Sequence, residues 1–552
     1  MFKRIKEVVE FLLIYIQKEK CMYIFVFSAT LIFITALMYI PIPNLLGNIT
    51  NLLNIANPKR NVGNILATII ALLLLYVVRY FLSVYSKNNF SKIEKKVVSS
   101  VKIDMLQKYL DMPMEEIEKE SKGVSMGRIE ETAQLSQIFS PGFIGMILNF
   151  FEFLFSIIII GTMNIYIICV LCIIIPLYYW GMKKMSDKIG TATIELYQTS
   201  NSLTNKIFET INGTAEIKIL NGQDFILKGI KKETEKNIVA SVRQNKLLFV
   251  FTENVQFVYN IMNLAMVSFL VLFILMKQIN FAEYIILSGY IVKVLSFVQG
   301  FSSIDTILQP VYVAMNRIKT FLAVSGESGN KKILIERCQK IEFEGVYFKY
   351  GDSHKYALED VNFSYELNSK LRIKGQNGTG KSTIVKLILG VYSPLKGRIL
   401  INDVPIEKID VFSLRKRVGI VSQDIVLFND TIENNILLGR DDVSEDALDT
   451  LLEGLQLKGF FDSFENGRKT IISKNSIGIS GGQAKIIALL RALVAKKDII
   501  ILDEFSANVD SVLTQKIIDA FRNDEICKSL IVISHTGEWN WIQNVYELRV
   551  RE

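Results

Sequence analysis

Two short motifs in this 552-residue chain carry residue types suited to binding phosphate. The first, Gly-Gln-Asn-Gly-Thr-Gly-Lys-Ser at 375–382, fits the Gly-x-x-x-x-Gly-Lys-Ser/Thr phosphate loop. Its glycines let backbone N–H groups turn inward around phosphate oxygens, and Lys381 adds a positive charge. The apolar strand at 371–373 precedes this loop and a helix over 382–390 follows it, so the helix N-terminus also faces the phosphates. The second motif is Ile-Ser-Gly-Gly-Gln at 479–483. A phosphate loop alone occurs in many kinds of nucleotide-binding protein, so the second motif is required to identify the class.

Two further polar groups follow apolar runs that are typical of buried strands. Residues 499–502, Ile-Ile-Ile-Leu, lead into Asp503 and Glu504. Residues 531–533, Ile-Val-Ile, lead into a loop that contains His535. Because α/β sheets bind ligands at the C-terminal ends of their strands, we expect the carboxylates of Asp503 and Glu504 to emerge at the ligand-binding end of a sheet.

In this order, and in one chain with a long apolar first half, the motifs resemble those of the ATP-binding cassette (ABC) family, specifically half-transporters of the exporter type. Residues 479–483 differ by one residue from the Leu-Ser-Gly-Gly-Gln signature of that family. Residues 346–350 (Val-Tyr-Phe-Lys-Tyr) match the aromatic loop, 421–424 (Val-Ser-Gln-Asp) match the Q-loop, and 506–510 (Ser-Ala-Asn-Val-Asp) resemble the D-loop. The resemblance covers nearly the whole chain, with its strong motifs in 346–536.

The resemblance implies a role for each matched residue. Glu504 would polarise the attacking water as general base or orienter, and His535 would lie near the γ-phosphate. Gln423 would bind Mg²⁺ or the attacking water, and Ser382 and Asp503 would hold the same ion. Tyr350 would stack on adenine, and the ATP-binding residues would be Tyr350, Gly375, Gln376, Asn377, Gly378, Thr379, Gly380, Lys381, Ser382 and Thr383. ATP and Mg²⁺ are therefore the expected cofactors.

The signature would act on ATP that is bound to the opposite subunit. Its residues precede a helix whose dipole favours phosphate, and they are Ser480, Gly481, Gly482 and Gln483. The D-loop would contain Ala507, Asn508 and Asp510. One cassette supplies half of each composite ATP site, so we expect a dimer. The intact catalytic positions favour a homodimer, with a heterodimer as the alternative.

The chain departs from the family pattern in two places. Ile479 replaces the leucine that begins the signature, which is a mild change in an apolar anchor. Residues 470–476 replace the acidic, glycine-containing segment that exporters carry before the signature. That segment meets the coupling helices in the family, so the second departure leaves the details of coupling open.

The first 325 residues are rich in apolar runs that are long enough to cross a bilayer. The whole chain is 50% hydrophobic, with a mean hydropathy of +0.31. We predict six spans, with spans 3 and 4 and spans 5 and 6 joined tightly, near 20–43, 63–85, 141–161, 163–182, 248–276 and 281–304. Lys and Arg crowd the long polar regions after spans 2 and 4, so the positive-inside rule places the N-terminus and the C-terminal domain in the cytoplasm. The predicted location is the cell membrane, as a multi-pass protein, and specifically the bacterial inner membrane.

These patterns predict two domains of different class. An all-α six-helix transmembrane domain spans 1–325, and an α/β P-loop NTPase domain of the ABC type spans 335–552, with a linker at 326–334. The polar regions after spans 2 and 4 resemble the helical extensions of exporters, with short coupling helices near 121–128 and 212–218. Residues before the first span form an amphipathic stretch that we expect to lie along the membrane surface.

Four charged residues lie in or near the predicted spans and are candidates for a translocation cavity: Arg79, Glu152, Glu253 and Lys293. Charges are costly in hydrocarbon and often mark functional sites. Lys293 lies about a dozen residues into the sixth span, and two hypotheses remain open for it. It either faces an aqueous cavity or pairs with a carboxylate for structural reasons.

Charge and cysteine content exclude some other classes. The net charge of +8 comes largely from basic residues in the loops between spans, which argues against a nucleic-acid partner. Cys169 and Cys172 form a C-x-x-C inside an apolar run, where cysteine behaves as a small hydrophobe. A zinc site needs about four ligands, and the chain has only two histidines, both in the other half.

We therefore predict an ATP hydrolase coupled to transmembrane transport, working as a dimer by alternating access in a lipid bilayer. The exported substrate is predicted to be a small peptide or an amphiphilic compound, and the alternative is a lipid or a lipid-linked glycan. A rival of another class is an ATP-gated sensor or receptor without net transport. The six apolar spans exclude a soluble ABC ATPase of DNA repair or translation.

Overall fold

A computed structural model describes residues 2–53, 62–119, 122–302, 304–327, 333–351, 353, 355–376, 378–440, 443–472, 479–507, 509–524 and 526–548. The predictions for Ser121, residues 328–332, Asn377, residues 473–476 and Asn508 lie outside these ranges. The chain divides into two compact units, Met1–Leu110 with Glu120–Val324 and Asp111–Lys119 with Ser325–Glu552. The second unit thus includes Asp111–Lys119, which sequence analysis assigned to the transmembrane domain.

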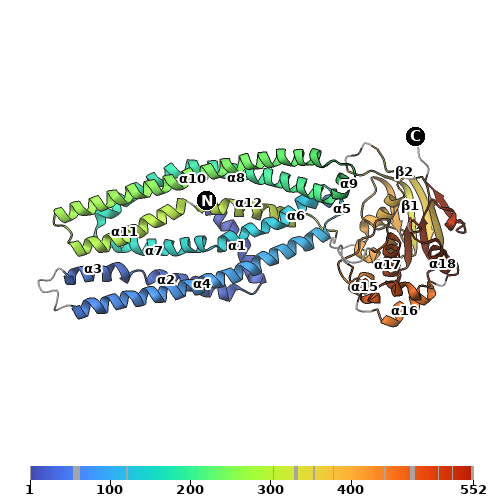
Figure 1. Ribbon diagram of the computed structural model, residues 1–552, viewed down its shortest axis with the longest axis horizontal. Helices are drawn as coiled ribbons and strands as arrows, with labels where there is room; N and C mark the ends of the chain where they lie inside the picture. The colour runs from blue at the N-terminus through green and yellow to red at the C-terminus, as the bar shows by residue number, and fades with distance from the viewer. Residues whose placement is uncertain are drawn as a thin grey trace. The chain divides into compact units, whose positions relative to one another are not determined.

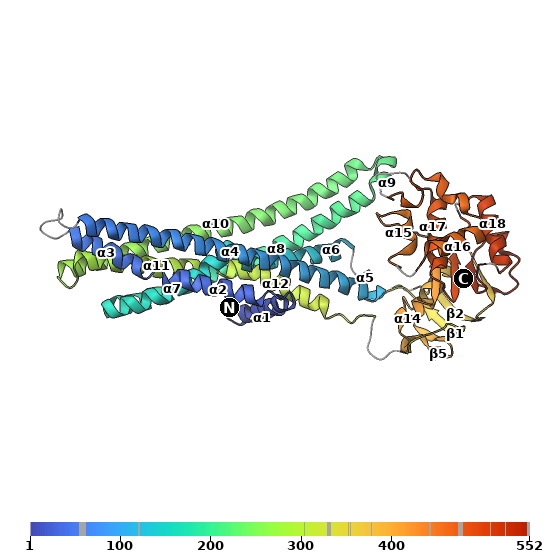
Figure 2. The same ribbon diagram turned by 90° about the horizontal axis from the view of Figure 1, so that it is seen from below.

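The first unit is helical, as predicted, and Figures 1 and 2 show its long helices α8 and α10 side by side. Its elements are α1 (Phe2–Lys18), α2 (Met22–Leu37), α3 (Pro41–Leu53), α4 (Val62–Asp111), α6 (Lys122–Glu130), the 3₁₀ helix η2 (Glu131–Phe139), α7 (Pro141–Met163), α8 (Ile165–Asn212), α9 (Thr214–Ile219), α10 (Gln223–Leu275), α11 (Phe281–Ser302) and α12 (Ile304–Leu322). Each of the six predicted spans is therefore largely helical within the described residues, although α4, α8 and α10 extend well beyond the predicted bounds.

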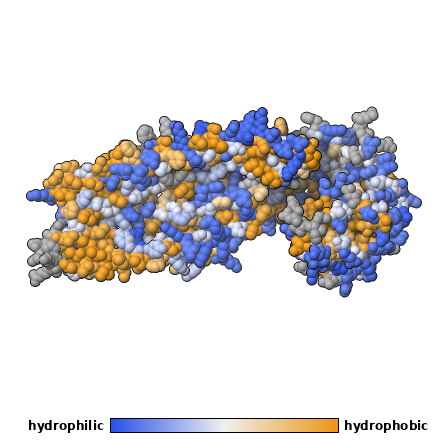
Figure 3. Space-filling model, viewed as in Figure 1, coloured by the Kyte–Doolittle hydropathy of each residue, from blue (hydrophilic) through white to orange (hydrophobic). Residues whose placement is uncertain are grey.

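The apolar parts of these helices are suited to a bilayer. Within the described residues, five helical stretches are long and apolar enough to cross it: Met22–Leu53, Val62–Asp111, Gly123–Met163, Gln223–Leu275 and Phe281–Phe301. Ile165–Pro176 is a shorter apolar helix at the position of the fourth predicted span. Figure 3 shows apolar side chains gathered around α3 and the neighbouring ends of α4, α10 and α11. The first unit thus carries an exposed apolar face, which lipid can cover.

Capping residues set the tight joints between consecutive helices. The Ser140 side chain accepts a hydrogen bond from the backbone N–H of Phe143 at the start of α7. Asn164 alone separates α7 from α8, and its side chain accepts from the N–H of Tyr166. Lys277, between α10 and α11, adopts a left-handed backbone with φ of +58°. These caps satisfy N–H groups that helix ends would leave unpaired.

The first predicted span is two helices rather than one. Helix α2 ends at Leu37 and α3 begins at Pro41. Proline has no N–H to donate and is favoured at the first position of a helix, so it starts a new helix here. The apolar stretch then continues to Leu53, beyond the predicted end at 43.

The N-terminal amphipathic stretch forms α1, but protein covers its apolar face. Phe11 and Ile16 are at most 5% exposed. On the facing helix α12, the Tyr312 hydroxyl donates to Glu7 at 3.1 Å, and the Lys319 ammonium lies over the Phe11 ring. Packing against α12 therefore covers part of the apolar surface of α1, while Val9 and Ile14 stay exposed, and the position of α1 along the membrane surface stays a prediction.

The second unit is an α/β domain with two sheets. Its antiparallel sheet has the order β2-β1-β4-β5, and its parallel sheet has the order β6-β7-β8-β3-β9. The strands are β1 (Lys340–Phe348), β2 (Leu358–Glu366), β3 (Lys370–Lys374), β4 (Lys396–Ile401), β5 (Val404–Pro405), β6 (Val418–Val421), β7 (Ile499–Asp503), β8 (Leu530–Ile533) and β9 (Val545–Glu547). All residues of β7 and β8 are buried, which explains why these strands read as continuous apolar runs.

Helices of the second unit flank and connect these strands. They are α5 (Met114–Glu118), α13 (Lys381–Ile388), α14 (Val411–Arg415), α15 (Ile432–Leu437), α16 (Glu445–Gly454), α17 (Gly481–Val494) and α18 (Ser511–Arg522), with 3₁₀ helices η3 (Ile406–Lys408), η4 (Lys458–Ser463), η5 (Gly467–Lys469) and η6 (Gly537–Trp539). One apolar core lies around the antiparallel sheet and β3, and a second lies under α15–α18. The parallel sheet lies between the two cores, because alternate side chains of its strands enter each of them, such as Ile499 and Ile501 in the first and Ile500 and Leu502 in the second.

Candidate functional site

Four loops at one edge of the parallel sheet carry the predicted nucleotide residues. Gln423 follows β6, Asp503 ends β7, His535 follows β8 and the phosphate loop follows β3. These four strands are consecutive neighbours in the sheet. Because parallel strands end at the same edge, the topology brings together residues that lie more than a hundred positions apart, at the edge where α/β sheets bind ligands.

Glycine is required at two positions of the phosphate loop. Gly378 and Gly380 have φ angles of +81° and +89°, which place both in the left-handed region. A Cβ atom at Gly380 would lie 2.4 Å from the carbonyl oxygen of Ala357. Side chains are therefore excluded from Gly380 by both backbone strain and close approach.

Lys381 is the first residue of α13 and is buried. Its ammonium donates to the carbonyl oxygens of Gly375 at 3.0 Å and Gln376 at 2.8 Å. The charge is thereby held within the loop that it is predicted to serve. Helix α13 ends at Ile388, two residues before the predicted end, because Gly390 has a φ of +61°.

Glu504 has a left-handed backbone with φ of +49°, which is uncommon for a residue other than glycine. Consecutive side chains of a strand point to opposite faces, and this turn directly after β7 breaks that alternation. The Gln423 amide donates to the Glu504 carboxylate at 3.0 Å, and His535 Nδ1 lies 3.8 Å from its other oxygen. The Lys485 ammonium donates to the backbone carbonyl of Glu504 at 2.6 Å, which helps to hold the turn.

Asp503 is suited to hold a hard cation. It is 4% exposed, and burial raises the pKa of its carboxyl group, while a hydrogen bond from the Ser382 hydroxyl opposes that rise. Its buried Oδ1 atom has no hydrogen-bond partner. The amide nitrogen of Gln423 donates to Glu504, so the amide oxygen of Gln423 remains available as a third oxygen ligand for a cation. This all-oxygen set from Asp503, Ser382 and Gln423 fits Mg²⁺, which prefers carboxylate, hydroxyl and phosphate oxygens.

Aromatic and cationic neighbours hold the Tyr350 ring in place. Its hydroxyl is 2.9 Å from the Thr383 hydroxyl, and its ring packs edge-on against the Tyr392 ring, with centroids 5.4 Å apart. The Lys386 ammonium lies over both rings, at 5.3 and 5.6 Å from the centroids. Adenine stacking on Tyr350 stays a prediction, and these contacts provide a fixed ring for it.

The signature caps the start of α17. The Ser480 hydroxyl accepts from the Gln483 N–H at 3.2 Å, and the Gln483 side chain accepts from the Ser480 N–H at 3.0 Å. Ser480 and Gly481 are exposed, so the helix N-terminus is open to an anion. In the D-loop, Asp510 caps α18 by accepting two backbone N–H groups, and the Ala507 N–H donates to the carbonyl of Glu504.

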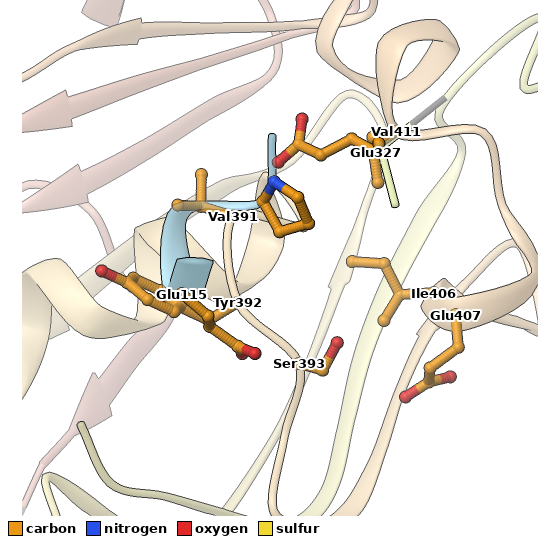
Figure 4. A pocket seen from close by; sticks show the side chains of 11 residues that line it. Glu115, Glu327, Val391, Tyr392, Ser393, Ile406, Glu407 and Val411 are labelled. Atoms are coloured by element: carbon orange, nitrogen blue, oxygen red, sulfur yellow. The ribbon is translucent and has the colours of Figure 1, made fainter. Parts of the chain in front are cut away.

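The segment Asp111–Lys119 packs against the cassette within the second unit. The Tyr392 hydroxyl donates to Glu118 at 2.5 Å, and the Glu327 N–H donates to the carbonyl of Asp111 at 2.7 Å. Figure 4 shows the resulting cavity of about 230 Å³, which is lined by Pro113, Glu115, Gly326, Glu327, Gly390, Val391, Tyr392, Ser393, Ile406, Glu407 and Val411. Three glutamates thus line this cavity together with apolar residues, glycines, Ser393 and Tyr392.

These contacts involve a segment that precedes the first predicted coupling element, and a coupling role for residues 121–128 stays a prediction. Helix α4 ends before Pro113, because proline disfavours a helical residue in front of it, and α5 follows as a separate short helix. The described part of 121–128 belongs to α6 in the first unit. The second predicted element, 212–218, corresponds to the short helix α9.

Three of the four charged membrane candidates meet in one cluster. Glu152 of α7 is 1% exposed, and Arg79 of α4 donates to one of its carboxylate oxygens. Lys293 Nζ of α11 lies 2.9 Å from the other oxygen, close enough for an ion pair although not at a hydrogen-bonding angle. Both cations lie over the Tyr39 ring. Glu253 is exposed on α10 and stands apart from this cluster.

Carboxylate pairing is thus present at Lys293, which is 28% exposed. A role for Lys293 in a translocation cavity stays a prediction. The two cations outnumber the single carboxylate of the cluster, and together these residues tie α4, α7 and α11 to the break between α2 and α3.

Sequence analysis missed four residues that support the nucleotide site: Arg372, Lys386, Tyr392 and Lys485. Arg372 interrupts an apolar strand, and Lys485 lies inside a largely buried helix. A charged residue within an otherwise apolar stretch could therefore have identified both from the sequence. Lys386 and Tyr392 carried no such signal, because a lysine in a helix and a tyrosine after its end are common residue types at such positions, and the sequence did not show that Tyr392 would be buried.

Comparison with known proteins agrees with this geometry. The model of the ABC transporter family matches residues 358–507, and that of the ABC transporter transmembrane region matches residues 25–298. A solved structure described as a bacterial Atm1-family ABC exporter with ATP bound has a TM-score of 0.83 and 18% identity, covering 97% of this chain and 94% of that one. At this identity, the likeness concerns the fold.

Curated relatives of similar identity have names that refer to different cargo. An ATP-dependent lipid A-core flippase of Methylobacillus flagellatus is 24% identical over 83% of this chain and 78% of its own length. A lactococcin transport/processing ATP-binding protein LcnC-like of Lactococcus lactis is 23% identical over 87% and 67%. A multidrug resistance-like ATP-binding protein MdlB of Buchnera aphidicola is 27% identical over 85% and 81%. With a helical transmembrane region followed by an ATPase domain, the chain belongs to the ABC transporter family as an exporter-type half-transporter.

Proposed function

We propose that this ATP-driven ABC exporter works as a homodimer and moves a small peptide or an amphiphilic compound by alternating access. The main support for ATP hydrolysis is the position of the Glu504 carboxylate, which lies 3.0 Å from the Gln423 amide nitrogen and 3.8 Å from His535 Nδ1. It lies at the edge of the sheet that also holds the phosphate loop and Asp503. A carboxylate, an amide and an imidazole thus lie close together, which supports the proposed roles of Glu504 as proton acceptor and of Gln423 as the group that orients the water.

The proposed reaction is attack of water on the γ-phosphorus of ATP, which breaks the bond to the β-phosphate oxygen and releases ADP and phosphate. Glu504 accepts or orients the water proton, and His535 contacts the γ-phosphate. Lys381 balances phosphate charge from the start of α13. Asp503, Ser382 and Gln423 would hold Mg²⁺, which neutralises charge on the phosphates when it is bound.

The signature supports a site that is shared between two chains. Its capped helix start presents Ser480 and Gly481 to solvent, where phosphate from another subunit can reach them. A chain with one cassette needs a second cassette to complete such a site. We propose a second copy of the same chain, because one sequence supplies both the phosphate loop and the signature.

A small peptide or an amphiphile is the substrate that we favour, and a lipid or lipid-linked glycan is the second candidate. The second candidate is supported by the lipid A-core flippase relative, and the first by the lactococcin and multidrug-resistance-like relatives. The cytoplasmic position of the N-terminus and of the cassette follows from the distribution of Lys and Arg.

Reconstitution in liposomes tests the proposed function. With cassettes facing outward, added ATP should drive uptake of labelled amphiphilic peptides or dyes, and Glu504→Gln protein should not support uptake. ATP-driven movement of fluorescent lipid instead would favour the flippase. Hydrolysis by the wild type without movement of peptide, dye or lipid probes would contradict export and favour a sensor.

A further inference from the structure

Arg372 is a buried cation in the strand that leads into the phosphate loop. It lies in the middle of β3, between β8 and β9, and is 3% exposed. Its neighbours Leu371 and Ile373 are buried apolar residues, as expected for a central strand. Among the described residues, no carboxylate forms an ion pair with Arg372, and burial lowers the pKa of its guanidinium. Burying an unpaired charge costs desolvation free energy, so the contacts of Arg372 indicate which function could offset that cost.

The guanidinium of Arg372 binds the loop on both sides of His535. One terminal nitrogen donates to the carbonyl oxygen of Thr536 at 2.5 Å and lies 3.5 Å from that of Ser534. The other terminal nitrogen donates to the side-chain oxygen of Asn540, and Nε is buried without a partner. The planar guanidinium therefore holds the carbonyl before His535, the carbonyl after it, and the turn that follows.

The same loop is braced around His535 by its own hydroxyl groups. The Ser534 and Thr536 hydroxyls are 2.7 Å apart, and the Thr536 N–H donates to the Ser534 hydroxyl at 3.1 Å. The Ser534 N–H donates to the carbonyl of Ile373, which is the residue after Arg372. His535 itself is 53% exposed, so little packing fixes its imidazole. Its direction toward Glu504 must come from the backbone on either side.

We propose that Arg372 is a positioning residue for ATP hydrolysis, which fixes the direction of His535 by binding the two carbonyl groups that flank it. This inference rests on the proposed role of His535 in hydrolysis. The competing explanation is that Arg372 only ties β3, β8 and the turn after β8 together. The two explanations differ in whether its loss moves His535 or only lowers stability.

Arg372→Met tests the proposal in the full-length chain, with Lys370→Met as the matched control. Methionine keeps much of the apolar stem and removes the charge and its donors. Lys370 lies on the same strand, and its ammonium pairs with Asp524 and lies over the Trp541 ring, so it shares the strand and the following turn with Arg372. Its contacts are not to the carbonyl groups that flank His535, which makes it a control for the strand and the turn alone. We expect Arg372→Met to lower kcat roughly ten- to hundredfold, the range for a misplaced catalytic group. KM for ATP should stay unchanged and the melting temperature should shift by only a few degrees, because losing the buried charge offsets the lost hydrogen bonds. Lys370→Met should leave kcat unchanged.

Histidine NMR gives a readout that does not depend on activity. The chain contains two histidines, so His354→Gln protein labelled at the histidine Cε1 carbon reports on His535 alone. Arg372→Met should shift or broaden this signal, whereas Lys370→Met should leave it in place. Arg372→Lys keeps the charge but lacks the planar guanidinium, so its His535 signal and its kcat should lie between those of the wild type and Arg372→Met. If the methionine variant does not fold, the lysine variant tests whether Arg372 positions His535.

An unchanged kcat and an unmoved His535 signal in Arg372→Met would overturn the proposal. A loss of kcat that follows a matching loss of melting temperature, with the His535 signal in place, would also overturn it and assign Arg372 to structure alone. If the wild-type protein hydrolyses no ATP, the proposed function fails, and the NMR comparison still shows whether Arg372 positions His535.

Discussion

The membrane unit and the cassette each bury a carboxylate beside cations, and the two sites are built differently. In the membrane unit, Arg79 and Lys293 bind the two oxygens of Glu152, so the carboxylate is balanced from within. In the cassette, the Oδ1 atom of Asp503 is buried without a partner, beside a phosphate loop with inward-turning glycines. Glu152 Oε2 and Asp503 Oδ1 are both buried without a hydrogen-bond partner, but the Lys293 ammonium lies 2.9 Å from Glu152 Oε2. The difference is therefore that a cation of the protein faces the membrane carboxylate, whereas Asp503 Oδ1 remains available to a ligand.

The difference also lies in what positions the groups. Each cassette residue sits in a loop that is fixed by neighbouring strands, a helix cap or a left-handed turn, as at Glu504. The three membrane charges sit on three separate helices, and the packing of those helices brings them together. We infer that the cassette positions groups for chemistry, while the membrane cluster primarily joins helices.

Removing the proton acceptor of the cassette should have the largest effect. Glu504→Gln keeps the shape of the side chain but cannot accept a proton, so hydrolysis should fall by about 10²- to 10⁴-fold, the usual contribution of general base catalysis. ATP binding should persist, because Lys381 and the phosphate loop are untouched. Turnover and nucleotide binding of purified protein check this, and turnover close to that of the wild type would remove Glu504 from the role.

Removing the carboxylate of the membrane cluster should mainly reduce stability. Glu152→Gln leaves the cations of Arg79 and Lys293 without their counter-ion, which should cost about 3 kcal/mol of unfolding free energy, as for other broken buried ion pairs. Glu253→Gln is the control, since that carboxylate is exposed and outside the cluster. Thermal unfolding in detergent compares the two, and equal stability of both variants would contradict a joining role for Glu152.

Removing Lys293 should have the smallest effect on stability. In Lys293→Met protein, Arg79 still binds Glu152, and Lys293 is partly exposed, so the change should stay below about 1 kcal/mol, the range of exposed pairs. A larger loss would show that Lys293 rather than Arg79 balances the carboxylate. Transport that falls while stability and basal ATPase hold would assign Lys293 to the cargo pathway.

The cassette could be predicted from sequence because its chemistry depends on local spacing. A phosphate loop needs glycines at fixed positions, and Gly378 and Gly380 have the left-handed backbones that this spacing implies. Apolar strands before Glu504 and His535 indicated that both would reach the same edge of a sheet. The positive φ of Glu504 could not be predicted, because no sequence rule marks a left-handed residue other than glycine or asparagine.

For the membrane cluster, the sequence could predict only that several charged residues lie in apolar spans, where a charge is energetically unfavourable. Arg79, Glu152 and Lys293 lie far apart in the sequence, and helix packing decides which of them meet. The same limit applies to Asp111–Lys119 and to Arg372, whose partners come from distant segments. Residue types show that such groups need partners, and the tertiary structure selects those partners.

Mixing two inactive variants tests the central claim that each ATP site is shared between two copies of this chain. Lys381→Ala disables the phosphate loop and Ser480→Arg blocks the signature, so each homodimer should be inactive at both sites. A mixed dimer places the intact phosphate loop opposite the intact signature at one site. We predict partial recovery of ATPase activity in tagged, purified mixed dimers. No recovery in verified mixed dimers would contradict two independent sites shared between copies of this chain.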